Sequence, residues 1–225
     1  MSQRMTVLLQ CLLFVLPWPL RRAALQAFFH FEIADGARIG LSILAIRKLK
    51  MASSSRIGNL TFCKGLSLME LGEAATIGSL NWITGFPEDD KTFFSSDVGR
   101  LPQLVIGAHS AITNRHYIDC TNSFRIGRFT TFAGVRSQVL THSINLAECR
   151  QESHPVTLGD YCFVGTNCVL LSGSALPDYS VLGANSTLNK VYEQSHMLYA
   201  GTPARPVKHL DTNMAYFNRK VGFVH

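Results

Sequence analysis

The stretch that decides the fold is residues 158–188, LGDYCFVGTNCVLLSGSALPDYSVLGANSTL. An aliphatic residue, here called an anchor, returns in it at every sixth position without a break. The anchors are Leu158, Val164, Leu170, Leu176, Leu182 and Leu188. A small residue stands four places after each of the first five, at Cys162, Cys168, Ser174, Ser180 and Ser186. A repeat this short and strict predicts a solenoid.

A unit of six residues suits one short extended segment and one tight corner, with a single large side chain pointing inward. Three such segments close a triangular coil, and successive coils stack at the spacing of neighbouring strands, about 4.8 Å. Each anchor then lies on the anchor of the coil before it, so the interior becomes three aliphatic ladders. The small residue is required because a bulky side chain would clash inside the corner.

The same phase can be followed towards the N-terminus, and it predicts one solenoid of about six or seven coils. The earlier anchors are Ile33, Ile39, Ile57, Cys63, Leu71, Ile77, Ile83, Ile106, Ile112, Ile118, Ile126 and Phe132. Two inserts interrupt the repeat, near residues 85–103 and 141–157. We therefore divide the chain into an apolar segment 1–32, a solenoid 33–208 and a tail 209–225. Inserts at solenoid corners are the usual place for binding chemistry.

Three features together resemble the hexapeptide-repeat acyltransferases: the hexads, Thr141-His142-Ser143, and residues 199–206, YAGTPARP. Within that family the chain is most similar to the sugar and polysaccharide O-acetyltransferases, and the resemblance covers roughly residues 57–208. It implies an all-β fold, the left-handed parallel β-helix, although parallel crossovers are otherwise almost always right-handed. It also implies transfer of an acetyl group from acetyl-CoA to a hydroxyl of a sugar, and together with the apolar N-terminus it favours a lipid-linked polysaccharide precursor as one form of the acceptor.

His142 is the candidate general base, since the family places its catalytic histidine in a comparable loop. A neutral imidazole can take a proton from a sugar hydroxyl and later return it to the departing thiolate. Asp119, Glu148 and a backbone carbonyl are all open as the group that orients the ring. No covalent intermediate is required, because Cys162 and Cys168 occupy small core positions rather than an activated setting.

The late coils are the predicted site for coenzyme A. Matching the family's motif positions puts Gly165, Thr166, Gly183 and Ala184 along the pantetheine arm, followed by Asn189. Lys190, Arg205 and Lys208 would meet phosphate. We expect a backbone N–H of the 165–166 stretch to bind the oxyanion. The resemblance further implies a homotrimer whose active sites lie between subunits, so that His142 and the coenzyme groove come from different chains.

His116 and Arg136 are the candidate acceptor-binding residues. Each stands four places after an anchor, Ile112 and Phe132, where a small residue is expected. If the phase holds, the two side chains stack on one face and line a groove, since neither can sit unpaired in a dry corner. The alternative is a distorted corner that sends both to solvent.

Composition limits the partners. Lys and Arg outnumber Asp and Glu by 21 to 15, a formal charge of +6, which suits anionic ligands or an anionic membrane surface. The basic residues form no stripe interleaved with aromatic residues, so we do not expect nucleic acid as a partner. The six cysteines include no Cys-x-x-Cys pair, and several fill repeat positions, which favours the reducing cytoplasm.

The N-terminal segment admits three interpretations. Residues 5–16 are apolar except for Thr6 and Gln10, a length too short for a helix to cross a bilayer, which takes about twenty residues. One interpretation is a pair of helices lying on the inner face of the membrane, anchored by Trp18, Arg21 and Arg22. A second is a cap over the open end of the solenoid, which is compatible with the first. The third, a signal peptide, has a poor cleavage site.

Other functions remain open at this stage. The same base could serve N-acetylation of an amino sugar, and a catalytically inactive solenoid could act as a scaffold or membrane adaptor. A β-helix can also carry a zinc carbonic anhydrase site, which needs three converging histidines. Here His109, His116, His142 and His154 contain no closely spaced pair, so no metal is expected.

Overall fold

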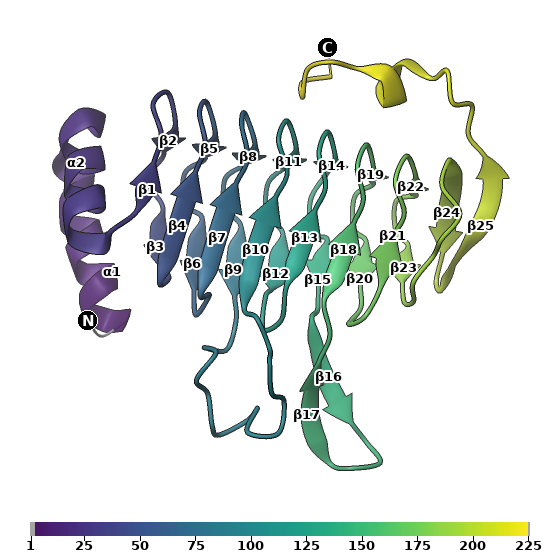
Figure 1. The fold of residues 1–225 in the computed structure, drawn as a ribbon, viewed down its shortest axis with the longest axis horizontal. Helices are drawn as coiled ribbons and strands as arrows, with labels where there is room; N and C mark the ends of the chain where they lie inside the picture. The colour runs from purple at the N-terminus through teal and green to yellow at the C-terminus, as the bar shows by residue number, and fades with distance from the viewer. Residues whose placement is uncertain (1–2, 225) are drawn as a thin grey trace.

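The solenoid runs the length of the molecule, with two helices at its N-terminal end and the C-terminal segment folded back along one side (Figure 1). The computed structural model describes residues 3–224. Residues 1, 2 and 225, which belong to the predicted terminal segments 1–32 and 209–225, lie outside the described residues. Helices α1 (Gln3–Leu12) and α2 (Trp18–Phe29) are joined by the 3-10 turn η1 (Leu13–Val15).

The coils build three sheets, and strands of successive coils pair in parallel, whereas the last pair of sheet B, 197–201 with 204–209, is antiparallel. Sheet A contains β1 (Glu32–Ile33), β4 (Lys48–Met51), β7 (Leu68–Leu71), β10 (Gln103–Ile106), β13 (Phe124–Ile126), β18 (Val156–Leu158) and β21 (Ala175–Leu176). Sheet B contains β2 (Arg38–Ile39), β5 (Arg56–Ile57), β8 (Thr76–Ile77), β11 (Ala111–Ile112), β14 (Thr131–Phe132), β19 (Phe163–Val164), β22 (Val181–Leu182), β24 (Met197–Gly201) and β25 (Ala204–His209). Sheet C contains β3 (Ile43–Ala45), β6 (Phe62–Lys64), β9 (Trp82–Thr84), β12 (Tyr117–Asp119), β15 (Gln138–Val139), β20 (Val169–Leu170) and β23 (Thr187–Leu188). The predicted parallel β-helix is confirmed.

The predicted anchors form the interior ladders. In sheet A, Leu71, Ile106, Ile126, Leu158 and Leu176 are successive partners in register, and each is at most 3% exposed. Such one-dimensional stacking buries every anchor between the coils before and after it, so hydrophobic burial accumulates coil by coil.

The small positions also carry hydrogen bonds from coil to coil. At the corner between sheets B and C, the N–H of Asn81 bonds Thr61 Oγ1 at 3.2 Å, and Asn81 Oδ1 accepts from the N–H of His116 at 2.9 Å. His116 Nδ1 in turn accepts from the N–H of Ser137 at 3.2 Å, and Ser137 Oγ accepts from the N–H of Cys168 at 3.0 Å. These side chains satisfy corner amides that the short strands leave unpaired.

The predicted stacking of Arg136 on His116 is wrong by one residue. The coil that follows Phe132 contains one extra residue, and Gly134 accommodates it at a φ of 75°. The N–H of Arg136 therefore bonds the carbonyl of Arg115, while the N–H of Ser137 meets His116. Arg136 is exposed at the turn and Ser137 takes the small position.

His116 does not line a groove either, because it is fully buried. Its Nε2 lies 3.0 Å from Thr113 Oγ1, and its ring meets Phe132 edge to face at 4.8 Å between centroids. A neutral ring satisfies both contacts, with Nε2–H donating to Thr113 and Nδ1 accepting. Burial lowers the pKa of His116 to about 4.

This histidine should make stability depend on pH. In the unfolded chain its pKa returns to the usual 6.5, so between that value and about 4 the unfolded state binds more protons. Stability should therefore fall by roughly 3 kcal/mol as pH drops through this window. Urea unfolding at several pH values measures it. The variant His116→Gln should lose that part of the slope, and an unchanged slope would contradict the assignment.

Both inserts leave the coil at the corner between sheets C and A, here called the insert corner. The first occupies residues 85–102, between β9 and β10, and the second holds the antiparallel hairpin β16 (His142–Asn145) and β17 (Arg150–Ser153), between β15 and β18. They project from the same side of the solenoid (Figure 1). The end of β12 lies between the two inserts.

The helices cap the first coil through side chains that hydrogen-bond its open backbone edge, as a neighbouring strand would. Gln10 donates to the carbonyl of Leu44 at 2.9 Å and accepts from its N–H at 2.7 Å, which occupies the open edge of sheet C. Arg21 is buried and donates to the carbonyl of Ile39. The predicted membrane anchor at Arg21 is therefore wrong, because this guanidinium faces the solenoid. Capping of exposed edges is what prevents pairing with other chains.

No helix among residues 3–224 is long and apolar enough to span a membrane.

The C-terminal tail covers a column of stacked rings on the corner between sheets A and B. His109, Phe129, Tyr161, Tyr179 and His196 repeat there, with successive centroids 4.8 to 5.2 Å apart. The 3-10 turn η2 (Ala215–Asn218) places Phe217 edge-on against the last two of these rings. The Arg219 guanidinium lies 5.5 Å from the ring of Tyr161. The tail is thus part of the folded body.

Candidate active site

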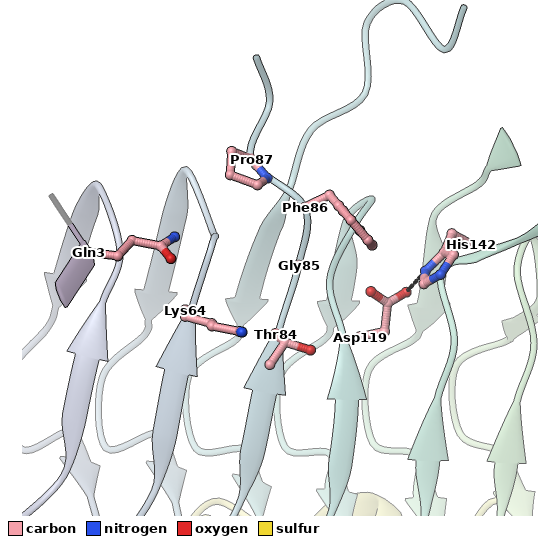
Figure 2. A pocket seen from close by; sticks show the side chains of 8 residues that line it. All are labelled: Gln3, Lys64, Thr84, Gly85, Phe86, Pro87, Asp119 and His142. Carbon is pink, nitrogen blue, oxygen red and sulfur yellow. Dashed lines mark hydrogen bonds and ion pairs between the residues drawn. The ribbon is translucent and has the colours of Figure 1, made fainter. Parts of the chain in front are cut away.

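A cavity of about 370 Å³ opens along the insert corner. Asp119 and His142 line one end and Lys64 and Gln3 the other, with Thr84, Gly85, Phe86 and Pro87 between them (Figure 2). The lining residues come from the ends of successive sheet C strands, the bases of both inserts and helix α1. Its volume falls within the usual range for small-ligand sites.

His142 and Asp119 form a hydrogen-bonded pair. They lie 23 positions apart in the chain, yet His142 Nδ1 is 2.8 Å from Asp119 Oδ2 (Figure 2). A carboxylate can only accept, so Nδ1 carries the hydrogen and the lone pair of the neutral ring is on Nε2. The His142 side chain is 29% exposed and that of Asp119 is 12% exposed. Of the three orienting groups considered above, the structure selects Asp119.

Asp119 is held as a carboxylate by further donors. Thr141 donates to Oδ2 from its N–H at 2.8 Å and its hydroxyl at 2.7 Å, and Thr121 donates to Oδ1 from its N–H at 3.1 Å and its hydroxyl at 2.6 Å. Burial alone would raise the pKa of Asp119. The hydrogen bonds from His142, Thr121 and Thr141 outweigh it, so this pKa lies below the ordinary value. Glu148 instead pairs with Arg150.

Two aromatic rings of the first insert pack against the imidazole of His142. Phe86 and Phe94 meet His142 edge to face, with centroids 5.8 and 5.7 Å away. Arg100, which is 3% exposed, holds this insert in place. Its guanidinium donates to the carbonyls of Phe86 at 2.7 Å, Pro87 at 2.6 Å and Thr121 at 3.0 Å, and lies 4.6 Å from the ring of Phe94.

The two inserts are also bonded to each other. Ser153, at the end of the hairpin, donates to Asp97 Oδ2 of the first insert at 2.5 Å. Ser153 Oγ accepts from Asn122 Nδ2 at 3.0 Å, and Asn122 follows β12 at the same corner. The imidazole is therefore held by the hydrogen bond to Asp119 and by the packing of Phe86 and Phe94, and the two inserts around it are bonded together, which is what a catalytic group requires.

The predicted coenzyme residues lie in three places, two corners of the coil and strand β25. Gly165, Thr166, Gly183 and Ala184 lie on the corner between sheets B and C, where the N–H of Asn185 bonds the carbonyl of Thr166. Asn189 and Lys190 follow β23 and so lie on the insert corner, beyond the coil of His142. Arg205 and Lys208 are exposed on β25.

The predicted oxyanion donor is narrowed to one residue. The N–H of Gly165 bonds the carbonyl of Leu182 at 2.8 Å, so within the 165–166 stretch the N–H of Thr166 stays as the candidate. One whole side of the coil, the sheet C side, separates this corner from His142. Within one chain, the predicted pantetheine residues and the candidate base therefore lie at different corners.

Several residues of the site escaped sequence reasoning. Phe86, Phe94 and Arg100 lie in the first insert, and Lys64 and Gln3 come from another coil and from α1. One signal was available: Asp119 follows the anchor Ile118 directly, at the corner where the second insert leaves. The paired Phe93-Phe94, between the charged run 88–91 and the polar residues 95–97, is a second signal.

The buried cysteines are not nucleophiles. Cys162 and Cys168 are both fully buried at their small positions, and burial raises the pKa of Cys162 to about 12. A thiolate is required for nucleophilic attack, so neither is activated. Within residues 3–224, no three His, Cys, Asp or Glu side chains gather in a way that could hold a metal ion.

Neither a known family model nor a curated protein matches this sequence. Solved structures match it in shape. The polysialic acid O-acetyltransferase OatWY superposes with a TM-score of 0.58 at 17% identity, over 80% of this chain and 84% of that one. The hexapeptide-repeat acetyltransferase VCA0836 from Vibrio cholerae gives 0.49 at 18% identity, over 93% of both chains. The polysialic-acid-specific acetyltransferase NeuO gives 0.45 at 15% identity, over 80% and 86%. The chain has the left-handed parallel β-helix fold of the hexapeptide-repeat acetyltransferases.

Proposed function

We propose that this protein transfers an acetyl group from acetyl-CoA to a hydroxyl of a sugar, with His142 as the general base. The observation that carries the proposal is the Asp119–His142 pair at the wall of the cavity, with Nδ1 fixed at 2.8 Å from the carboxylate. The fold supports it, and the match to OatWY, a polysialic acid O-acetyltransferase, supports a glycan acceptor.

The chemistry follows from the geometry of the pair. His142 Nε2 takes the proton of the acceptor hydroxyl as that oxygen bonds to the acetyl carbonyl carbon. Asp119 stabilises the positive charge that the ring acquires. As the bond between carbon and sulfur breaks, the ring returns the proton to the coenzyme thiolate. The ester and the free thiol are the products, and His142 is regenerated.

We propose a homotrimer with active sites between subunits. The division of the predicted coenzyme residues supports this arrangement, because Thr166 and Gly183 lie a full side of the coil away from His142 in the same chain. In the assembly the insert corner of one subunit would face the corner of Gly165 and Ala184 in the next. Lys190 and Arg205 would then meet the phosphates of the coenzyme. The mass of the assembly in solution tests the stoichiometry.

We further propose that the protein lies on the inner face of the cytoplasmic membrane, where acetyl-CoA is available. The capping helices expose large apolar side chains to solvent, at Leu8, Leu12, Val15, Leu20 and Phe28. Apolar side chains on surface helices bind the interfacial region of a bilayer, and the net positive charge favours anionic lipids. Flotation with anionic vesicles measures this binding, which Phe28→Glu should weaken; no flotation of the unaltered protein would refute it.

The test of the activity is release of free CoA from acetyl-CoA in the presence of a panel of glycans. Mass spectrometry of the product should show the added acetyl group. An O-acetyl ester is removed by mild alkali whereas an N-acetyl amide resists it, so the same sample separates transfer to oxygen from transfer to nitrogen. A protein that binds no acetyl-CoA and releases no CoA with any acceptor would act as a scaffold instead.

A further inference from the structure

The cavity at His142 continues into a second, apolar groove. Gln3 and Lys64, at the end of the cavity away from His142 (Figure 2), also line a groove of about 440 Å³ between α1 and sheet C. Val7, Leu8, Cys11, Ala45 and Phe62 form most of its wall. The cavity and the groove therefore share a boundary. The cavity on one side of it holds the candidate base, and the groove on the other side is apolar.

The junction between them is positively charged. Lys64 lines both spaces, and Arg4, next to Gln3 in the chain, lines the apolar groove. Both side chains are exposed. Among the described residues, neither forms an ion pair. Two cations without counter-ions at such a boundary favour an anionic group in the ligand.

We infer that the acceptor is amphiphilic, a sugar linked through phosphate to a long hydrocarbon chain. The inference rests on the proposed transferase function and names the class of its acceptor. The sugar occupies the cavity with its hydroxyl at His142 Nε2, the phosphate meets Lys64 and Arg4, and the hydrocarbon lies along Leu8 and Phe62. Burial of the hydrocarbon gives affinity, and the charge at the junction sets its register.

The polar cavity, the positively charged junction and the apolar groove follow one another in that order. This order fits an amphiphilic acceptor better than a free glycan. A soluble polysaccharide, even one whose carboxylates could pair with Lys64, would leave the apolar wall of Val7, Leu8 and Phe62 in water. Exposed apolar grooves that adjoin a site generally mark ligand binding. Helix α1 then serves both as a cap and as one wall of the acceptor site.

The experiment compares two acceptors that carry the same sugar. One ends in a free reducing end, and the other is linked through phosphate to a short alkyl chain and used below its micelle concentration, so that membrane binding plays no part. We expect kcat/KM to be at least about tenfold higher for the alkyl phosphate, mainly through a lower KM. A third acceptor with the alkyl chain but no phosphate separates the two contributions.

Matched variants locate the effect. Leu8 and Leu12 lie on the same helix with similar exposure, 57% and 61%, but only Leu8 lines the groove. Leu8→Glu should abolish the preference for the alkyl chain, and Leu12→Glu should keep it. Lys64→Gln should abolish the preference for phosphate, whereas Lys50→Gln, on the outer face of sheet A, should not.

Equal kcat/KM for the three acceptors, with CoA released from each, would refute the amphiphilic acceptor and leave the transferase function standing. A preference that Leu8→Glu and Lys64→Gln leave unchanged would refute the groove as its binding site. Absence of CoA release with every acceptor would overturn the proposed function, and this inference with it.

Discussion

Replacing His142 with alanine is expected to lower kcat for acetyl transfer by about 10²–10⁴-fold, the usual contribution of a positioned general base. The hydroxyl of a sugar is a weak nucleophile until its proton is taken, and Nε2 is the lone pair that the Asp119 contact leaves available. The KM for acetyl-CoA should change little, because the imidazole acts on the hydroxyl proton. Release of free CoA, followed with saturating acceptor, measures the effect.

His154 provides the control. It stands near the far end of the same insert, is exposed, and does not line the cavity. His154→Ala should keep the activity of the unaltered protein, which shows that removing a histidine from this insert does no general harm. If His142→Ala and the unaltered protein released CoA at the same rate, the assignment of the base would be wrong.

Asp119→Asn is expected to lower kcat by about 10²-fold or more with little change in the KM for acceptor. The amide keeps the shape of the carboxylate but not its charge, and it brings donors of its own. Five hydrogen bonds converge on Asp119, so the amide N–H₂ must face a donor of Thr121, Thr141 or His142. The ring then loses either its fixed orientation or the charge that stabilises its protonated form.

Two further variants separate this positioning role from a merely structural one. Thr121→Val removes the side-chain donor to Asp119 Oδ1 and the acceptor of the Phe86 N–H, but no contact of the imidazole itself; it should destabilise the fold by about 1 kcal/mol while kcat changes by less than about threefold. The double variant His142→Ala, Asp119→Asn should be no slower than His142→Ala alone, since the carboxylate acts through the ring. Fully additive losses would mean that Asp119 acts elsewhere.

The fold could be predicted from residues 158–188 because each side of the coil needs only one inward aliphatic residue at a fixed interval. The interval lengthens by one residue after Phe132, where no pattern in the sequence marks the extra residue that Gly134 accommodates. Because of this one extra residue, Arg136 is exposed to solvent and Ser137, not Arg136, lies next to the buried His116. Register in a solenoid depends on the length of every corner, and corner length is the least constrained part of the repeat.

The site was predictable in part. His142 stood out through resemblance to a known family, and Asp119 was one of three candidates for its partner. Choosing among them required knowing that two coils end at one corner, which depends on all the intervening residues. The positions of Phe86 and Phe94 depend on the hydrogen bonds from Arg100 to backbone carbonyls. Every residue has such a carbonyl, so the sequence does not show which ones Arg100 contacts.

The C-terminal tail changes how this solenoid should unfold. In an open stack each coil contacts only its neighbours, so the terminal coils can fray one at a time. Here Gly222 packs against the backbone of His109, and Phe217 against His196, near the end of the solenoid. Detaching the last coil therefore requires releasing contacts made several coils earlier. The C-terminal half of the molecule should open as one cooperative unit, and the base of the hairpin that carries His142 lies inside it.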